Sequence, residues 1–390
     1  MQKVIMTNRL PIKMWLDEVE ESTLTQARNL AQLPFAFKHV CLMPDAHSGY
    51  GMPIGGVLAT RGVIVPNAVG VDIGCGMCAV RTNVKAELLD AGILKQVMSR
   101  IREVIPLGFN HHEESQDENL MPQGYQIDNL AIVKRHYIAA LKQLGTLGGG
   151  NHFIELQKSN DGDLWVMIHS GSRNLGKQVA DFYNKAARRL NELWHSSVPV
   201  GADLAFLPIQ TNEAHAYFDE MRYCTDFAFA NRKLMINRVQ AIISDMVTGV
   251  VFDPVINIAH NYVAWENHFN QNVLVHRKGA TSAKPGETGI IPGSQGTKSY
   301  IVEGLGNPES FMSCSHGAGR VMSRSAAVRE LDLEEEIRKL DEQGIIHAIR
   351  SKDDLDEASS AYKDISQVMA FQQDLVRIKV ELTPLAVVKG

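Results

Sequence analysis

The chain has 390 residues, of which 45% are hydrophobic and 21% are charged, a composition typical of a globular protein. It has no apolar run of about 18 residues and no apolar signal-peptide core at its N-terminus, so we expect a cytoplasmic protein without a membrane span. The formal net charge of −5 argues against non-specific RNA binding over the whole surface, although it is compatible with a local basic patch. The five cysteines are sparse and odd in number, which does not indicate a disulfide framework.

Hydrophobic periodicity predicts helices and strands along the chain. In chain order these are a strand at 63–65, a helix at 127–144, a strand at 164–168, helices at 175–194 and 214–246, a strand at 255–258 and a helix at 332–344. The helix at 175–194 is expected to bury Val179, Phe182, Ala186 and Leu190 on one face. Two of the strands, in WVMIHSGS and VINIAHN, lead directly into a histidine, which is how active sites are commonly built on sheets.

The segment 108–124, GFNHHEESQDENLMPQG, is polar and has no hydrophobic period, so we predict a flexible loop there. Its adjacent histidines, His111 and His112, are compatible with a metal site or with simple solvation. Their polar setting favours solvation.

Seven short segments stand out, six of them containing glycine, and six of the seven hold His, Asp or Cys. They are PDAHSGYGMPIGG (44–56), VGVDIGCG (69–76), GTLGGGNHFIE (145–155), HSGSR (169–173), AHN (259–261), PGSQG (292–296) and SCSHGAGR (313–320). Glycine lets the backbone approach a ligand closely and leaves N–H groups free for phosphate. One such loop is a weak signal, but six are hard to explain by turns alone.

Within these segments we identify candidate metal ligands of three chemical types. They are Asp72, Cys75, His152, His169 and His260. A carboxylate, a thiolate and three imidazoles suit a borderline divalent ion such as zinc, iron or manganese. Five ligands exceed what one tetrahedral ion needs, which favours a two-metal centre. The alternative is that each histidine only satisfies a local hydrogen bond, and Cys78 of the CxxC is interpreted as a small buried residue.

Common nucleotide and hydrolase motifs are missing. GSQGTKS (293–299) resembles the tail of a phosphate-binding P-loop, but Thr297 stands where that motif needs glycine. The chain has no GxGxxG that opens a helix after a strand, no HExxH and no GxSxG.

Eight motifs together resemble the RtcB family of RNA ligases, in order and from about residue 8 to 390. They are VGVDIGCGM, GTLGGGNHFIE, HSGSR, AHNY, RKGA…GIIPGSQGTKSYIV, SCSHGAGRVMSR, AYKDI and the terminal VVKG. The resemblance implies an α+β fold in which residues 1–390 form a single mixed α/β domain, with central β-sheets surrounded by helices. It also implies a metal centre in a central cleft.

The resemblance further implies two manganese ions on the five candidate ligands, with Cys75 bridging the ions. His316 of SCSHGAGR matches the histidine that becomes guanylylated in the family. The positions implied to bind GTP are Asn151, His152, Phe153, Ile154, Glu155, His260, Asn261, Pro292, Gly293, Ser294, Gln295, Ser299, His316, Gly317, Ala318, Gly319, Tyr362 and Lys389.

The reaction implied by the resemblance has three steps after any 2′,3′-cyclic phosphate is opened. His316 attacks the GTP α-phosphorus, an RNA 3′-phosphate takes the GMP, and a 5′-hydroxyl attacks the activated end and expels GMP. The expected substrates are broken tRNA or rRNA fragments, with an activator protein as a possible partner and a monomer as the expected state. Arg173 and Lys278 are candidates for holding RNA phosphates, and a purely structural role of Arg173 is equally compatible with its loop.

Two other functions are compatible with parts of this pattern. A metal-dependent phosphoesterase acting on RNA ends would use the same ligands and would not need His316 as a nucleophile. A non-catalytic RNA-binding module fits less well, because the net charge is negative and reactive side chains are numerous.

Overall fold

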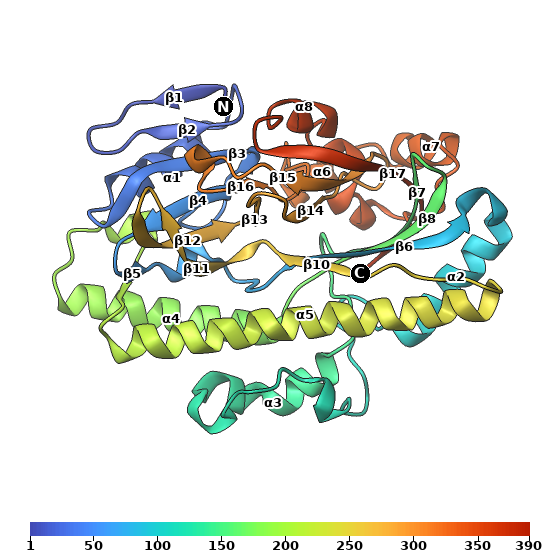
Figure 1. Cartoon of the computed structure of the whole chain (residues 1–390), viewed down its shortest axis with the longest axis horizontal. Helices are drawn as coiled ribbons and strands as arrows, with labels where there is room; N and C mark the ends of the chain where they lie inside the picture. Colours follow the sequence, from blue (N-terminus) through green and yellow to red (C-terminus); the bar gives the residue numbers. More distant parts are fainter.

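Two β-sheets and a layer of long helices make up the structure, a computed structural model that describes all residues 1–390 (Figure 1). The six-stranded sheet has the order β1 (Lys3–Ile5), β2 (Ile12–Met14), β3 (Ala36–His47), β4 (Ile54–Thr60), β12 (Gln271–Lys278) and β11 (Asn261–His268). The seven-stranded sheet has the order β10 (Ile256–Ala259), β6 (Gly76–Lys85), β8 (Asp163–Ser170), β7 (Phe153–Ser159), β17 (Val376–Lys389), β15 (Ser299–Gly304) and β14 (Thr288–Ile291). Two small pairs join β13 (Ala280–Ser282) to β16 (Ser313–Ser315) and β5 (Val63–Ile64) to β9 (Leu207–Pro208).

The seven-stranded sheet is buried on both faces, which explains why its central strands are continuously apolar in sequence. All eight residues of β8 are buried. Because side chains alternate along a strand, Val166 and Ile168 face a core shared with helices, whereas Trp165 and Met167 face a second core on the other side. His169 is next in this alternation and therefore lies on the side of Met167, away from the helices.

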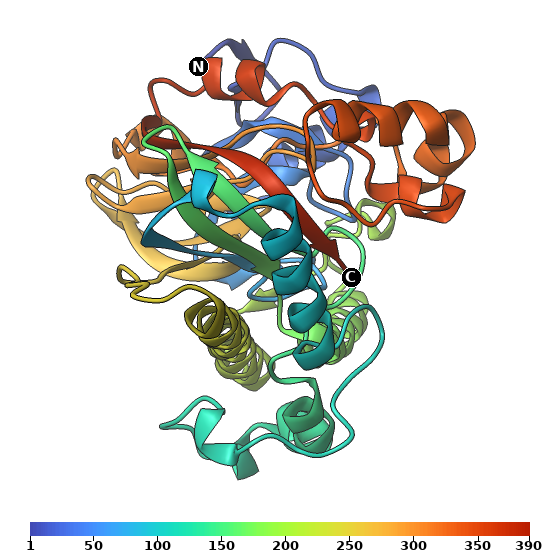
Figure 2. The ribbon, with the colours of Figure 1, turned by 90° about the vertical axis from the view of Figure 1, so that its right-hand side faces the viewer.

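The helices α4 (Arg173–Leu193) and α5 (Asn212–Met246) lie side by side beneath the sheets, and α3 (Ala131–Gln143) lies beyond them (Figures 1 and 2). The Thr211 hydroxyl caps α5 by accepting a hydrogen bond from the backbone N–H of Ala214. The other helices are α1 (Glu21–Gln32), α2 (Ala91–Val104), α6 (Arg324–Glu330), α7 (Leu333–Glu342) and α8 (Ile365–Ala370). None of the helices combines the length and apolar character that crossing a membrane requires.

The predicted α+β class is confirmed, and the four predicted helices correspond to α3, α4, α5 and α7. The predicted buried face of α4 is wrong in part, because Phe182 is 46% exposed. The helix instead buries Val179, Tyr183 and Ala187, which follow each other at a spacing of four. Both sets have helical spacing and share Val179, so periodicity alone did not separate them.

The segment 108–124 contains one short 3-10 helix, η3 (Glu118–Leu120), and lies near α3 and α5. Arg238 of α5 donates hydrogen bonds to the side chains of His112 and Gln116. Met121 is buried in the core formed by α3, α4 and α5. These contacts tie the segment to the helical layer, and its flexibility stays a prediction.

Candidate active site

Four of the five predicted metal ligands lie at one edge of the seven-stranded sheet. Its neighbouring strands β10, β6, β8 and β7 are antiparallel, so the end of one strand meets the start of the next. His260 directly follows β10 and Cys75 directly precedes β6, while His169 lies near the end of β8 and His152 directly precedes β7. The register therefore gathers four positions that are up to 185 residues apart in sequence.

The ligand atoms of the five residues converge on two adjoining points. The Sγ atom of Cys75 lies 3.3 Å from His169 Nε2 and 3.5 Å from His152 Nε2. His169 Nε2 is 3.4 Å from His260 Nε2, and His152 Nε2 is 3.2 Å from Asp72 Oδ2. One group of donors is Cys75, His169 and His260, and the other is Asp72, Cys75 and His152. Cys75 belongs to both groups, which is the geometry of a bridging ligand.

Backbone carbonyls hold two of these rings with Nε2 turned toward the cluster. His152 Nδ1 donates to the carbonyl of Leu147 at 2.9 Å, and His169 Nδ1 donates to that of Asn151 at 2.9 Å. Such a contact selects the tautomer whose Nε2 carries a free lone pair, as a metal ligand needs. Gly171 lies so close to Asp72 that any Cβ there would overlap the carboxylate.

The protonation states of the cluster fit a site that holds divalent cations. Burial raises the pKa of the Cys75 thiol, and the neighbouring Asp72 raises it further. Burial also lowers the pKa values of His169 and His260, so these rings are neutral near pH 7. A buried thiolate beside a carboxylate needs compensating positive charge, and neutral imidazoles do not supply it. Bound cations would, which supports metal binding by these residues.

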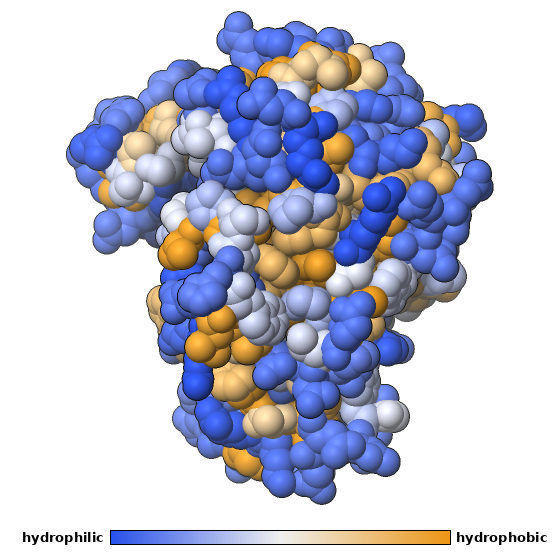
Figure 3. Space-filling model, turned by 90° about the vertical axis from the view of Figure 1, so that its left-hand side faces the viewer, coloured by the Kyte–Doolittle hydropathy of each residue, from blue (hydrophilic) through white to orange (hydrophobic).

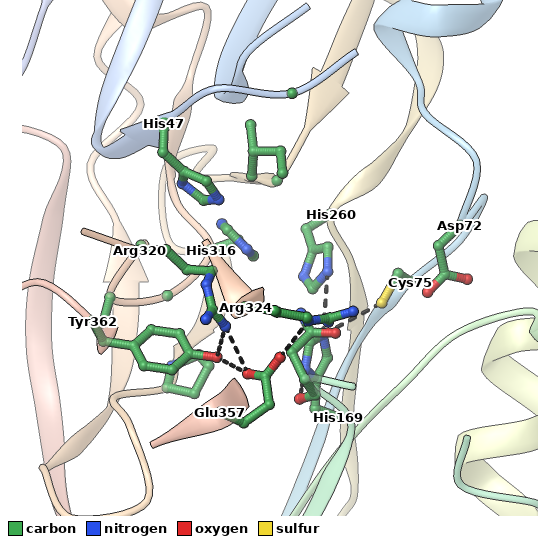
Figure 4. A pocket seen from close by; sticks show the side chains of 18 of the residues that line it. His47, Asp72, Cys75, His169, His260, His316, Arg320, Arg324, Glu357 and Tyr362 are labelled. Carbon is green, nitrogen blue, oxygen red and sulfur yellow. Dashed lines mark hydrogen bonds and ion pairs between the residues drawn. The ribbon is translucent and has the colours of Figure 1, made fainter. Parts of the chain in front are cut away.

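The predicted nucleophile His316 directly follows β16, a strand of the small β13–β16 pair, and lines the same cavity as the metal-binding side chains (Figure 4). Its Nδ1 donates to Asp45 Oδ2 at 2.6 Å, and its backbone N–H donates to the same oxygen at 3.0 Å. Asp45 lies in β3 and is fully buried. This contact leaves Nε2 as the free lone pair of the ring, and the ring lies 4.7 Å from that of His260 between centroids.

Two fully buried side chains hold the strand that carries His316. Arg277 donates to the hydroxyl of Ser313 at 2.9 Å and to the carbonyl of Phe311 at 3.1 Å. Gln372 donates to the hydroxyl of Ser315 at 2.5 Å and accepts from its backbone N–H at 3.0 Å. The strand is therefore fixed at both of its ends.

A buried carboxylate, Glu357, organises another part of the cavity wall (Figure 4). It lies 3.1 Å from Arg320 Nη1 and 2.7 Å from Arg324 Nε, and it accepts a hydrogen bond from the Tyr362 hydroxyl. The Arg320 guanidinium also stacks over the Tyr362 ring at 5.0 Å. Tyr362 was predicted from the sequence, whereas Glu357, Arg320 and Arg324 were not.

Four residues of the site were not predicted from the sequence, and they differ in whether a sequence motif could have revealed them. They are Asp45, Arg320, Arg324 and Glu357. Asp45, Arg320 and Arg324 lie in or beside the recognised motifs PDAHSGYGMPIGG and SCSHGAGRVMSR, which were a usable signal. Glu357 lies in the acidic stretch SKDDLDEASS, where it cannot be told from solvated neighbours.

The metal-binding cluster and the residues around His316 and Glu357 line one cavity of about 880 Å³. Among the residues predicted to bind metal or GTP, those that line it are Asp72, Cys75, Asn151, Phe153, Glu155, His169, His260, Asn261, Pro292, Gly293, Ser294, Gln295, His316, Gly317, Ala318, Gly319, Tyr362 and Lys389. His152, Ile154 and Ser299 lie outside the lining, and Ile154 packs into the core on the helix side of the sheet because it alternates with Phe153 and Glu155. The Ser299 hydroxyl accepts hydrogen bonds from Gln157 at 3.2 Å and from the backbone N–H of Gly293, a residue of the cavity lining, at 3.2 Å.

Glu155 is a carboxyl group with unusual protonation. Burial raises its pKa to about 8, against the opposing effects of Gln157 and Lys389. Gln157 donates to Glu155 Oε2 at 2.6 Å. Glu155, which this pKa keeps largely protonated near pH 7, and the nearby cation Lys389 both line the cavity.

The two RNA-binding candidates are both engaged within the protein. Arg173 donates to the hydroxyl of Thr146 at 3.0 Å and to the carbonyl of Gly108 at 2.9 Å, and it does not line the cavity. Lys278 lines the cavity, and its Nζ donates to the carbonyls of Tyr50 at 2.6 Å and Asn67 at 3.2 Å. These contacts favour the structural role of Arg173, and RNA binding by either residue stays a prediction.

Comparison with known proteins gives a consistent assignment. A family model described as tRNA-splicing ligase RtcB matches residues 26–390. The RNA-splicing ligase RtcB of Escherichia coli (strain K12) is 38% identical over 410 residues, covering 100% of this chain and 99% of that protein. The tRNA-splicing ligases RtcB of Nanoarchaeum equitans and Thermococcus kodakarensis are 34% and 30% identical, covering 95% and 98% of this chain and 92% and 95% of their own lengths. The sequence motifs, the paired groups of metal-binding side chains and these full-length similarities together establish that the chain belongs to the RtcB family.

Proposed function

We propose that this chain joins RNA ends that carry a 3′-phosphate or a 2′,3′-cyclic phosphate to ends that carry a 5′-hydroxyl, with GTP as the source of activation. The relatives named as RNA-splicing or tRNA-splicing ligases support RNA as the substrate. The single observation that carries the proposal is the pairing of His316 with Asp45, which leaves Nε2 free beside two groups of metal-binding side chains.

We propose two manganese ions as the metals, held by Asp72, Cys75, His152, His169 and His260. When bound, such ions act as Lewis acids that neutralise charge on a phosphate. Carboxylate oxygen suits manganese, whereas the thiolate and imidazoles also suit zinc, so purified protein is expected to take up either ion.

His316 is the proposed nucleophile in the first step. Its Nε2 forms a bond to the α-phosphorus of GTP while the bond to the leaving pyrophosphate breaks. The ring becomes positively charged as this bond forms, and the buried Asp45 carboxylate at 2.6 Å stabilises that charge. Arg320 and Arg324 bring positive charge to the same wall, where phosphate oxygens accumulate negative charge.

The proposed guanine position lies at the end of the cavity lined by Glu155, Tyr362 and Lys389. The Watson–Crick edge of guanine presents two neighbouring N–H donors and one carbonyl acceptor. The ionised form of Glu155, which the nearby Lys389 favours, accepts from the donors, and the Lys389 ammonium donates to the acceptor, so the two side chains are chemically suited to guanine.

In the later steps the RNA 3′-phosphate takes the GMP from His316, and the 5′-hydroxyl of the second strand then attacks that phosphate. The new phosphodiester bond forms as GMP leaves, and the hydroxyl proton passes to solvent. Because the residues of the site come from positions as far apart in sequence as Asp45 and Lys389, we propose that residues 1–390 act as one domain.

Incubation with α-labelled GTP and manganese, followed by denaturing electrophoresis, tests the proposal. The wild-type protein is expected to carry an acid-labile, alkali-stable label, as N–P bonds do, and His316→Ala is expected to carry none. Paired oligonucleotides with every combination of ends then test the sealing reaction. An acid-stable label, labelling of His316→Ala, or sealing only of 3′-hydroxyl to 5′-phosphate ends contradicts the proposal.

The alternative, a phosphoesterase acting on RNA ends without guanylylation, is less consistent with this site. Such an enzyme would need the metal-binding side chains only, and the buried Asp45–His316 pair would have no role. It predicts phosphate release from RNA ends without any labelling by GTP.

A further inference from the structure

Two apolar side chains at the mouth of the cavity have no role in the steps above. Tyr50 is 77% exposed and Val71 is 44% exposed, and both line the cavity that contains His316. Most of the molecular face in Figure 3 is hydrophilic, with apolar side chains gathered in limited patches. A single exposed apolar residue is ordinary, but two at the entrance to a cavity lined mostly by polar and charged residues indicate a contact surface.

The loop that carries Tyr50 is held firmly, although the ring itself is free. The side chain of Gln26 accepts from the backbone N–H of Gly49 at 3.1 Å and donates to its carbonyl. The buried Lys278 donates to the carbonyl of Tyr50 at 2.6 Å. A ring presented on a fixed backbone loses little freedom on binding, because only its own side-chain torsions remain to be ordered.

Lys278 also connects Tyr50 to the segment that carries Val71. Its ammonium bonds the carbonyl of Asn67 at 3.2 Å, and its alkyl chain packs against Gly70. The loop of Tyr50 and the turn before the metal-binding Asp72 are therefore braced by one side chain. This arrangement sets Tyr50 and Val71 on the same rim of the cavity.

The rim lies beside the proposed nucleophile. Tyr50 follows β3 by three residues, and β3 supplies Asp45, which holds His316, and His47, which lies near His316 in Figure 4. The guanine position proposed above uses other residues of the wall. The rim is thus next to the place where an RNA 3′-phosphate must lie to take GMP from His316.

We infer that Tyr50, with Val71 beside it, forms a stacking site for a nucleobase of the RNA strand that ends in the 3′-phosphate. The inference rests on the proposed function and adds to it the subsite of one strand. Aromatic rings bind unpaired bases through their faces and tolerate any base, which suits an enzyme acting on broken ends. The 5′-hydroxyl reacts only after GMP has left His316, so the transfer of GMP needs only the 3′-phosphate strand at this rim.

Steady-state sealing tests the inference, with the KM of each strand measured separately. Tyr50→Ala is expected to raise the KM of the 3′-phosphate strand about tenfold, the order of effect of losing one base–aromatic stack. Its KM for the 5′-hydroxyl strand and its labelling by GTP are expected to stay at the wild-type level. Tyr50→Phe keeps the ring and is expected to behave as wild type, as is Phe182→Ala, which removes an exposed aromatic ring outside the cavity.

Substrates with an abasic nucleotide at the 3′-phosphate end complete a double-mutant cycle. The wild-type protein is expected to lose affinity for the abasic strand, and Tyr50→Ala is expected to show no further loss. An unchanged KM in Tyr50→Ala, a rise confined to the 5′-hydroxyl strand, or an equal abasic penalty in both proteins overturns the inference. Wild-type protein that takes no label from GTP contradicts the proposed function itself, which separates the two failures.

Discussion

The metal-binding cluster and the nucleophile are positioned by different means. Four of the five metal-binding side chains sit at one edge of one sheet, where antiparallel register alone brings them together. His316 follows a three-residue strand and depends on side chains from elsewhere in the chain, namely Asp45, Arg277 and Gln372. Backbone pairing therefore builds one half of the site, and side-chain hydrogen bonds build the other.

This difference has consequences for mutation. Replacing a ligand at the sheet edge removes a donor but leaves the other donors where the backbone holds them. Replacing a side chain that holds His316 leaves the nucleophile present but free to turn. Loss of metal and loss of orientation are separable by measuring metal content beside the labelling rate.

The largest expected effect follows from Cys75→Ala, because Cys75 belongs to both donor groups. We expect labelling by GTP to fall to background and the metal content, measured by mass spectrometry, to fall at both positions. Cys78→Ala is the matched control, since Cys78 is equally buried but faces the core on the helix side. If Cys75→Ala keeps its full metal content, the bridging assignment is wrong.

Asp45→Asn is expected to slow labelling by up to roughly 10⁴-fold, as when the carboxylate that orients a catalytic histidine becomes an amide. Metal content should not change, because Asp45 contacts His316 and no metal-binding side chain. Asp163→Asn, at the far end of β8, alters a comparably buried carboxylate and should affect stability alone. Equal labelling rates in Asp45→Asn and wild type would show that His316 needs no such partner.

Arg277→Ala is expected to lower the free energy of unfolding by up to about 3–5 kcal/mol, because it removes the closest cation from the largely buried Glu266 carboxylate and leaves it only His268 and the more distant Lys284. Burial alone would raise the pKa of Glu266, but Arg277, together with the hydrogen bond from His268 and the charge of Lys284, outweighs burial and holds the pKa at about 2. This ion pair therefore stabilises the fold above the ordinary carboxyl range, and its contribution is lost as the pH falls toward 2.

Calorimetric melting temperatures between pH 2 and pH 7 measure this effect. The wild-type protein should lose stability over the acidic part of that range, and Arg277→Ala should lose less. Arg277→Lys keeps the charge but not the paired contacts to Ser313 and Phe311, so it should be intermediate. The same pH dependence in wild type and Arg277→Ala would contradict the assignment.

Gln372→Met should have the smallest effect. It leaves the backbone N–H of Ser315 without a partner, which costs about 1–3 kcal/mol of stability, and it frees one end of the strand before His316. We expect labelling by GTP to slow only a few-fold, since Arg277 and Asp45 remain. Ser315→Ala removes only the hydroxyl half of the contact and should be milder still; a larger effect than that of Asp45→Asn would reverse the proposed order of importance.

The sequence predicted the metal-binding half of the site better than its surroundings. Local sequence patterns indicate these residues. Short apolar strands lead into His169 and His260, and glycine turns surround Asp72 and Cys75. The convergence of these residues follows from strand order, which local patterns do not encode. The resemblance to the RtcB family supplied it.

The supporting half was not predictable in the same way. Glu357 contacts Arg324, 33 residues away in sequence, and Gln372 contacts Ser315, 57 residues away, and no local pattern distinguishes the two from surface residues. Ile154 was predicted among the GTP-binding positions as part of a continuous run, yet strand alternation turns it into the core. Phe182 was assigned to the wrong face of α4 because two overlapping sets of residues share helical spacing.

The position of β17 in the seven-stranded sheet has a consequence for the order of folding. This strand lies between β7 and β15 and provides the hydrogen-bonded connection between the two parts of the sheet, yet it follows all the other strands of the sheet in sequence. As a ribosome extends the chain, every metal-binding side chain emerges by residue 260, well before β17 is available. Pairings over such long separations close late and slowly. We therefore expect the nascent protein to acquire the edge that binds metal before it acquires the end of the cavity that includes Lys389.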